Sequence, residues 1–226
     1  MLRVFRDLTG FERALWITSV LVVTASFLAV PERDYLTLTA SLIGVTALIF
    51  VAKGYVIGQV LTVVFAVFYG VISCWQHYYG EMITYLGMTS PIAIAAVVTW
   101  LRHPYRDSRE VAVSSMTKKQ TAVMLLLTAA VTAVFYFILA ALGNARLLLS
   151  TLSVATSFIA SWLTLRRSPL YGLGYAANDL VLIGLWALAA GEDPACVPMV
   201  VCFVMFFLND AYGFFNWQRM KRRQAE

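Results

Sequence analysis

Long apolar segments, each bounded by a short polar stretch, recur along the whole chain. A helix needs about 20 apolar residues to cross a bilayer, and eight segments have a suitable length and composition. The predicted helices span residues 13–30, 35–52, 55–76, 82–101, 120–142, 146–165, 170–190 and 196–217. The pattern therefore predicts an all-α polytopic membrane protein with eight transmembrane helices.

Composition supports this class. The chain is 61% hydrophobic and only 13% charged, whereas soluble domains carry about 25% charged residues. A net charge of +5 would suggest a nucleic-acid partner in a soluble protein. Here the basic residues stand in short loops, so membrane topology explains them better and we expect no nucleic acid. The lipid bilayer is the expected surrounding.

The distribution of basic residues predicts the orientation of the helices. With eight helices, both termini and the loops after the second, fourth and sixth helices share one side. That side holds Arg3, Arg6, Arg13, Lys53, Arg102, Arg106, Arg109, Lys118, Lys119, Arg166, Arg167, Arg219, Lys221, Arg222 and Arg223. The other side holds only Arg33 and Arg146. Because cytoplasmic loops are rich in Lys and Arg, we expect a bacterial inner-membrane protein with both termini in the cytoplasm.

A faint internal repeat organises the predicted helices. Residues 40–44 resemble residues 156–160, and Trp100 and Trp217 end the two similar units. Each unit has three helices, so one further helix must lie between units of the same orientation. The layout is an accessory helix plus a SWEET-like 3+1+3 parallel repeat. The expected divisions are 1–34 lead-in and accessory helix, 35–101 first repeat, 102–145 solvated cytoplasmic loop and linker helix, 146–217 second repeat, and 218–226 basic tail.

Polar side chains gather in the last two predicted helices. Asn178 and Asn209 lie eight residues, or about 12 Å, from the cytoplasmic ends of their helices, and so at the same depth. Polar groups at that depth usually face the protein interior and often line a pathway. The candidate substrate-binding residues are Tyr171, Tyr175, Asn178, Asp179, Trp186, Asn209, Asp210 and Tyr212.

These residue types suit a heterocycle that carries a sugar or an amide. We expect Asn178, Asn209 and Tyr212 to contact the ligand while Tyr171 or Tyr175 stacks on its ring. The alternative is that the amides and hydroxyls only join helices, at about 0.6 kcal/mol per pair. The first repeat is poorer in polar groups, so it is expected to supply an apolar wall.

Three further features carry expectations. Pro91 should kink the fourth helix. Trp100 and Trp217, at helix ends, are expected to be interfacial anchors. Asp210 should be more accessible to water than Asp179.

Asp179 lies deep in the membrane with no Lys or Arg at its depth. Its carboxyl could stay protonated and bond to a neighbour such as Ser157, or take and release a proton during transport. It could also offset a positive charge on the substrate, which is the functional hypothesis that we favour.

Enzymatic residues are missing from the pattern. A membrane enzyme would need a nucleophile with a base, or carboxylates with a metal. His77 and His103 stand at the ends of different predicted helices. The three cysteines lack the spacing of metal ligands. We therefore expect no enzyme, no metal and no cofactor; a non-transporting receptor or scaffold subunit is an alternative.

The chain resembles the PnuC family of vitamin transporters over nearly its whole length. The resemblance rests on residues 52–54, residues 79–81 with Pro91 ten residues on, Trp186, and the motif Asn-x-x-Tyr-Gly-x-x-x-Trp at residues 209–217. It implies a facilitator that takes up nicotinamide riboside, a vitamin B3 precursor, by alternating access. It also implies a homo-oligomer, a trimer in the family.

Several positions depart from the family pattern. Tyr171 and Gly174 stand where the family has tryptophans, and Tyr85 and Ala93 stand where it has asparagine and glutamine. The substrate is therefore left open among small-molecule vitamins and nucleosides: nicotinamide riboside first, with thiamine, riboflavin and deoxynucleosides as alternatives.

Overall fold

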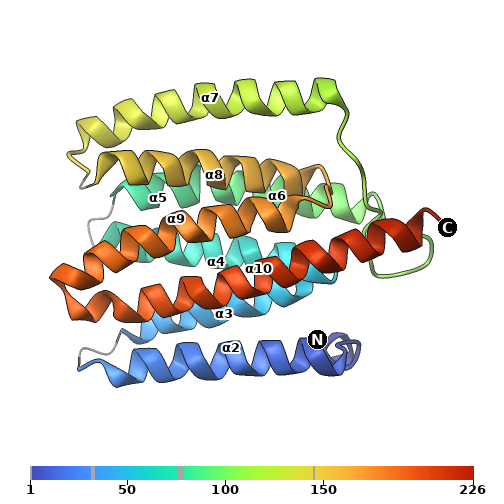
Figure 1. Ribbon diagram of the computed structural model, residues 1–226, viewed down its shortest axis with the longest axis horizontal. Coiled ribbons are helices and arrows are strands. Elements are labelled where there is room, and N and C mark those ends of the chain that lie inside the picture. The colour runs from blue at the N-terminus through green and yellow to red at the C-terminus, as the bar shows by residue number, and fades with distance from the viewer. Residues whose placement is uncertain (1, 32–33, 76–78, 145) are drawn as a thin grey trace.

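The computed structural model describes residues 2–31, 34–75, 79–144 and 146–226, which fold as a bundle of helices (Figure 1). Its elements are α1 (Leu2–Arg6), α2 (Gly10–Ala29), α3 (Tyr35–Ala52), α4 (Val56–Trp75), α5 (Tyr79–Thr84), the π-helical turn η1 (Tyr85–Thr89), α6 (Ser90–Leu101), α7 (Lys118–Ala141), α8 (Leu147–Leu165), α9 (Tyr171–Glu192), the 3₁₀ turn η2 (Pro194–Cys196) and α10 (Val197–Gln224).

Seven helical stretches in the described part of the chain are long and apolar enough to cross a membrane. They are α2, α3, the continuous stretch Gly80–Leu101, α7, α8, α9 and the stretch Pro194–Gln224. The apolar part of α4, Val56–Ile72, is shorter than these seven stretches. The protein is thus a multi-pass membrane protein, as the apolar pattern predicts.

Successive long helices run in opposite directions, with α2 at one edge of the bundle and α7 at the other (Figure 1). Helix α2 packs on α3 and α10, and α7 packs on α8. Both chain termini and the connections 53–55, 102–117 and 166–170 lie at the same end, called here the terminal end. The connections from α7 to α8 and from α9 to α10 lie at the opposite end.

Helix α2 begins three residues before its predicted start. Thr9 and Glu12 form a capping box: the Glu12 carboxylate accepts from Thr9 N at 2.7 Å, and Thr9 Oγ1 accepts from Glu12 N at 3.3 Å. These bonds satisfy backbone donors that a helix start leaves free. Residues 10–12 are therefore the first turn of the spanning helix and no separate lead-in.

Pro91 perturbs its helix through a π-helical turn. The five residues Tyr85–Thr89 are π-helical, and α6 begins directly after them with Pro91 in its first turn. Proline lacks an N–H and clashes with the carbonyl four residues earlier, and a π turn accommodates such a break. Tyr85, at the start of this turn, faces the interior, as described below.

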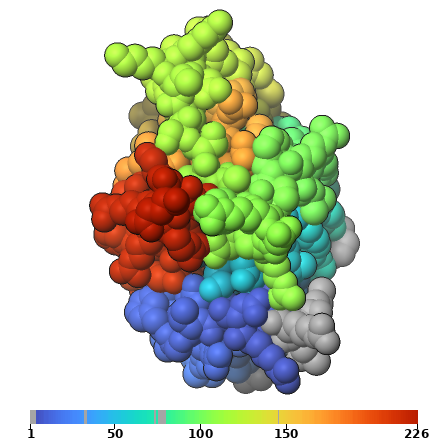
Figure 2. Space-filling model, turned by 90° about the vertical axis from the view of Figure 1, so that its right-hand side faces the viewer, coloured from blue at the N-terminus to red at the C-terminus, as the bar shows by residue number. Residues whose placement is uncertain are grey.

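The linker between α6 and α7 is not the solvated connection that its composition suggests. Val111 is buried, its carbonyl accepts from Gln224 Nε2 at 3.2 Å, and Ser114 N donates to Arg167 O at 2.9 Å. Figure 2, a view of the terminal end, shows this green segment between the red end of α10 and the blue N-terminal residues. The linker therefore joins both halves of the chain at the terminal end.

Two neighbours of the linker show how tightly it is held. Burial, together with the carboxylates of Asp7 and Glu110, raises the pKa of Tyr55 to about 12. Helix α10 continues past Trp217 to Gln224, with Met220 buried and Arg223 paired with Glu110. The predicted tail 218–226 is thus largely helical and packed.

Helices α9 and α10 touch through their backbones near the terminal end. A Cβ atom on Gly172 would lie 2.5 Å from Asp210 O and from Phe214 N. A Cβ on Gly213 would overlap the Tyr171 hydroxyl. Small residues allow this close approach in membrane bundles, and here it brings the polar residues of the two helices together.

Candidate functional site

A cavity of about 400 Å³ enters the bundle from the opposite end and reaches the middle of α9. Residues of α4, α5, η1, α8, α9 and α10 form its walls, and the α7–α8 connection forms part of its rim. The polar and aromatic lining residues are Tyr69, Glu81, Thr84, Tyr85, Asn144, Arg146, Ser150, Ser153, Ser157, Asn178, Trp186, Glu192, Asp193 and Phe203. This volume is within the range for small-molecule sites.

Two of the eight predicted site residues line this cavity. Asn178 is buried, and its Oδ1 accepts from Thr156 Oγ1 at 2.8 Å. Its amide nitrogen has no acceptor among the described residues. Trp186 lies two turns further along α9, and its indole N–H has no partner among the described residues either. Both residues thus leave a donor for a bound molecule.

Residues 35–101, predicted to supply an apolar wall, contribute polar groups to the cavity as well. Glu81, Thr84 and Tyr85 line the cavity from α5 and η1. The Tyr85 ring lies 4.6 Å from that of Tyr69, and the Tyr69 hydroxyl is hydrogen-bonded to the Glu81 carboxyl. Their spacing of three and four residues puts these three side chains on one helical face.

Three serines of α8 were missed as cavity residues. Ser150, Ser153 and Ser157 all line the cavity. Their spacing of three and four residues puts them on one face of a helix. The sequence alone could have indicated this face of α8, because serines at membrane depth favour an interior face.

Asp179 and Asp210 form a pair in the interior of the bundle, outside the cavity lining. Their exposed fractions are 3% and 2%, and their carboxyl groups lie beside each other. The expectation that water reaches Asp210 more easily is therefore wrong for this conformation. Ser157, the suggested partner of Asp179, lies in the cavity wall instead.

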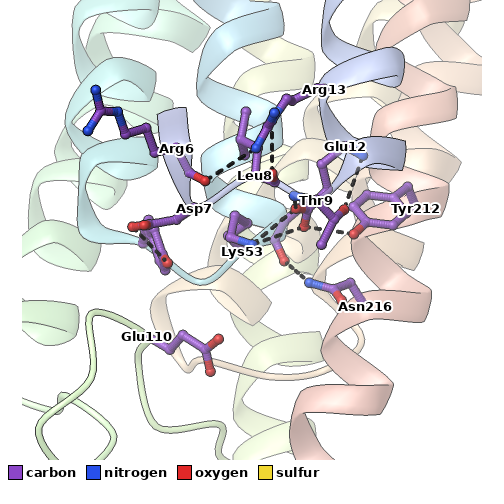
Figure 3. A network of polar contacts seen from close by, with 12 residues as sticks. Arg6, Asp7, Leu8, Thr9, Glu12, Arg13, Lys53, Glu110, Tyr212 and Asn216 are labelled. Carbon is purple, nitrogen blue, oxygen red and sulfur yellow. Dashed lines mark hydrogen bonds and ion pairs between the residues drawn. The ribbon is translucent and has the colours of Figure 1, made fainter. Parts of the chain in front are cut away.

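Asn209 and Tyr212 face α2 rather than the cavity. Asn209 Nδ2 donates to Ser19 Oγ at 2.9 Å and to Met205 O at 2.8 Å. The Tyr212 hydroxyl donates to Glu12 Oε1 at 2.8 Å, and Lys53 Nζ lies 3.0 Å from Glu12 Oε2 (Figure 3). In this conformation Asn209 and Tyr212 thus attach α10 to α2, and Asn178 at the same predicted depth has different partners.

An aromatic layer fills the bundle between the cavity and the terminal end. Tyr171 and Trp217 are fully buried with ring centroids 4.7 Å apart, and Trp217 lies 5.4 Å from Trp100. Tyr175 lies beside Tyr171, and its hydroxyl is 3.2 Å from Ser161 Oγ. We call Trp100, Tyr171 and Trp217 the aromatic layer. None of the three residues lines the cavity, so the layer separates the cavity from the terminal end in this conformation.

The prediction that Trp100 and Trp217 are interfacial anchors is wrong. Each is fully buried and donates its indole N–H to a backbone carbonyl in the other half of the chain. Trp100 Nε1 donates to Thr164 O at 3.0 Å, and Trp217 Nε1 donates to Val51 O at 2.9 Å. Val111 of the linker and Met220 of α10 lie in the same buried cluster, so these tryptophans meet protein instead of lipid headgroups.

A membrane-embedded helical bundle with a polar and aromatic cavity open to one end and closed to the other has the architecture of a small-molecule membrane carrier. Comparison with known proteins agrees with this class. The profile of the family described as nicotinamide mononucleotide transporter matches residues 34–219. The chain therefore belongs to the nicotinamide mononucleotide transporter family.

Individual relatives match over most of the chain. It is 24% identical to the nicotinamide riboside transporter PnuC of Neisseria mucosa over 226 residues, covering 98% of this chain and 86% of the relative. Identity to the nicotinamide riboside transporter PnuC of Haemophilus influenzae is 23%, covering 84% and 82%. The crystal structure of the vitamin B3 transporter PnuC superimposes with a TM-score of 0.82 at 23% identity, covering 96% of this chain and 94% of that one. It shares this fold.

Proposed function

We propose that this protein is a facilitator that carries nicotinamide riboside across the membrane by alternating access, and that it is not an enzyme. The observation that carries the proposal is the cavity, whose volume, free donors and aromatic rings suit a heterocycle with an amide and a ribose. Membership of the family and the two relatives named as nicotinamide riboside transporters support it.

Charge favours the riboside over a phosphorylated form. Among the described lining residues the carboxylates are Glu81, Glu192 and Asp193, and the one guanidinium is that of Arg146. Arg146 is already engaged by Glu192 at 2.6 Å. A phosphate needs unpaired cationic donors, whereas a riboside needs only amides and hydroxyls, which the serines and Asn178 supply.

We propose that α2 to α10 form eight spanning helices, with α2 as an accessory helix and a 3+1+3 parallel repeat in which α7 joins two units. The divisions at 1–34, 35–101, 102–145, 146–217 and 218–226 follow from this layout. Contacts across the units support it, because α3 packs on α10 and α8 packs on α6. The reciprocal bonds of Trp100 and Trp217 have the same symmetry.

The predicted site residues have different parts in this proposal. Asn178 and Trp186 contact the substrate in the present conformation. Tyr171, Tyr175, Asp179 and Asp210 lie between the cavity and the terminal end, so they contact it when that end opens. Asn209 and Tyr212 position α10 against α2.

The function predicts uptake of labelled nicotinamide riboside by proteoliposomes that contain the purified protein. Thiamine, riboflavin and a deoxynucleoside, each in excess, serve as competitors and should compete poorly. Asn178→Ala should weaken binding about tenfold, because truncating a partner of a buried polar ligand group costs about 1–3 kcal/mol. Uptake of only one of the other compounds would identify that compound, and not nicotinamide riboside, as the substrate. Binding without any uptake would instead indicate a receptor.

We also propose that the terminal end faces the cytoplasm of a bacterial inner membrane, since that end carries the basic residues. In a background with Cys74, Cys196 and Cys202 replaced by serine, an impermeant thiol reagent added outside whole cells should label Glu192→Cys. It should label Ser108→Cys only after lysis, and the reverse pattern would contradict the proposed orientation. The trimer implied by the resemblance is testable by mass measurement in detergent micelles.

A further inference from the structure

Glu81 is a carboxyl group in the cavity wall that the protein itself satisfies only in part. Its Oε2 atom is buried and accepts no hydrogen bond among the described residues. The Tyr69 hydroxyl is its one hydrogen-bond partner in the described part of the chain. Glu81 belongs to none of the ion pairs that the described residues form. A carboxylate in such a place is costly unless a cation joins it.

The described residues offer no cation at this position. Arg146 is the guanidinium of the described cavity lining, and it donates to Glu192 Oε1 at 2.6 Å and to Leu188 O at 3.0 Å. Both contacts lie on the last turns of α9, near the cavity mouth. Within the described part of the chain, an ionised Glu81 therefore has no counter-charge, and a bound cation would supply one.

The surroundings of Glu81 suit a flat cation. The rings of Tyr69 and Tyr85 lie beside it, 4.6 Å apart at 56° to each other, and Trp186 lines the same cavity. Aromatic faces attract cations that lie over them, most strongly where water is excluded. A positively charged heteroaromatic ring would satisfy both the carboxylate and the rings, whereas a neutral ring would leave the carboxylate unpaired.

We propose that Glu81 is the counter-charge that selects a substrate with a permanent positive charge on its aromatic ring. This inference rests on the proposed function and names the part of the substrate that is recognised, the pyridinium ring of nicotinamide riboside. The sequence suggests Asp179 as the residue that offsets the charge of the substrate. This inference assigns that role to Glu81 instead. Asp179 is paired with Asp210 outside the cavity lining.

The decisive comparison uses two ligands of the same shape and different charge. Nicotinamide riboside is a cation, and its 1,4-dihydro form is neutral. Wild-type protein in detergent should bind the cation at least tenfold more tightly. Glu81→Gln keeps the shape of the side chain and a partner for Tyr69, so it should weaken cation binding at least tenfold and leave the neutral form within twofold. Size-exclusion chromatography checks that the variant is folded.

Asp107→Asn is the matched control, because it removes an exposed carboxylate at the terminal end, outside the cavity lining. Exposed charges are screened by water and salt, so cation binding should change less than twofold.

Two outcomes would overturn the inference: Glu81→Gln weakens binding of both ligands equally, or both variants weaken cation binding equally. In either case, binding of nicotinamide riboside by the wild type would leave the proposed function intact. A wild type that binds only neutral riboflavin or deoxynucleoside would overturn both. A wild type that prefers cationic thiamine would overturn nicotinamide riboside alone and support the role of Glu81.

Discussion

Replacing Lys53 with methionine should destabilise the protein by about 3–5 kcal/mol, because it leaves the Glu12 carboxylate buried without its cation. Glu12 is 2% exposed, and Lys53 Nζ lies 3.0 Å from it (Figure 3). Thr9 N and the Tyr212 hydroxyl also donate to this carboxylate. The loss should appear as a decrease of roughly 6–20 °C in the thermal midpoint in detergent. Methionine keeps most of the apolar stem, so the change isolates the charge.

Two variants show whether burial is the cause. The double variant Glu12→Gln with Lys53→Met removes both charges and should recover most of the lost stability. Arg109→Met breaks the exposed pair with Asp7, in which the two side chains are 54% and 37% exposed, and should cost only about 0–1 kcal/mol. If Lys53→Met cost as little as Arg109→Met, then water would reach Glu12 in the folded protein.

This polar network explains why the start of α2 could be predicted only in part. Hydropathy alone places the helix start at Arg13, after Glu12. The pair Thr9 and Glu12 has the spacing of a capping box, so the true start was readable from local chemistry. The long-range partners Lys53 and Tyr212 were not, because they depend on how α2 packs on α3 and α10.

The order and approximate bounds of the long helices follow from hydropathy, because each helix must bury its own backbone polar groups in lipid. Helix rise also gives the depth of a residue, and Asn178 and Asn209 are both buried. Depth does not say which neighbour a helix face meets. Asn209 meets Ser19 of α2, whereas Asn178 meets Thr156 of α8. That difference explains why only some of the predicted site residues line the same cavity.

The cavity wall formed by residues 79–85 gives a second reason. Glu81, Thr84 and Tyr85 have the spacing of one helical face, so their alignment was readable from the sequence. The neighbours of that face were not, because they depend on how α5 packs beside α8, α9 and α10 around the cavity.

Trp217→Ala should have an effect as large as that of Lys53→Met. Trp217 is fully buried, contacts the rings of Tyr171 and Trp100, and donates its indole N–H to Val51 O. Deleting a buried tryptophan ring typically costs about 3–5 kcal/mol, through lost burial and the space left behind. Thermal unfolding in detergent should show this loss. Because the aromatic layer closes the terminal end, proteoliposomes with this variant should also release preloaded nicotinamide riboside faster.

The proposed repeat makes the prediction sharper, because it gives Trp100 and Trp217 equivalent places. Trp217→Phe and Trp100→Phe each keep a ring and remove one indole N–H from the carbonyl of Val51 or Thr164. Each carbonyl still accepts from a backbone N–H, so each change should cost about 0.5–1.5 kcal/mol beyond the smaller ring, and the two costs should agree. Trp16→Phe is the control: its indole N–H donates to the Thr46 hydroxyl in a half-buried place, where water replaces it.

The rings of Trp100 and Trp217 are in contact, so the double variant should depart from additivity by about 0.5 kcal/mol or more. Unequal single costs with strict additivity would show that the two tryptophans act separately, and the paired closure of the terminal end would have to be abandoned.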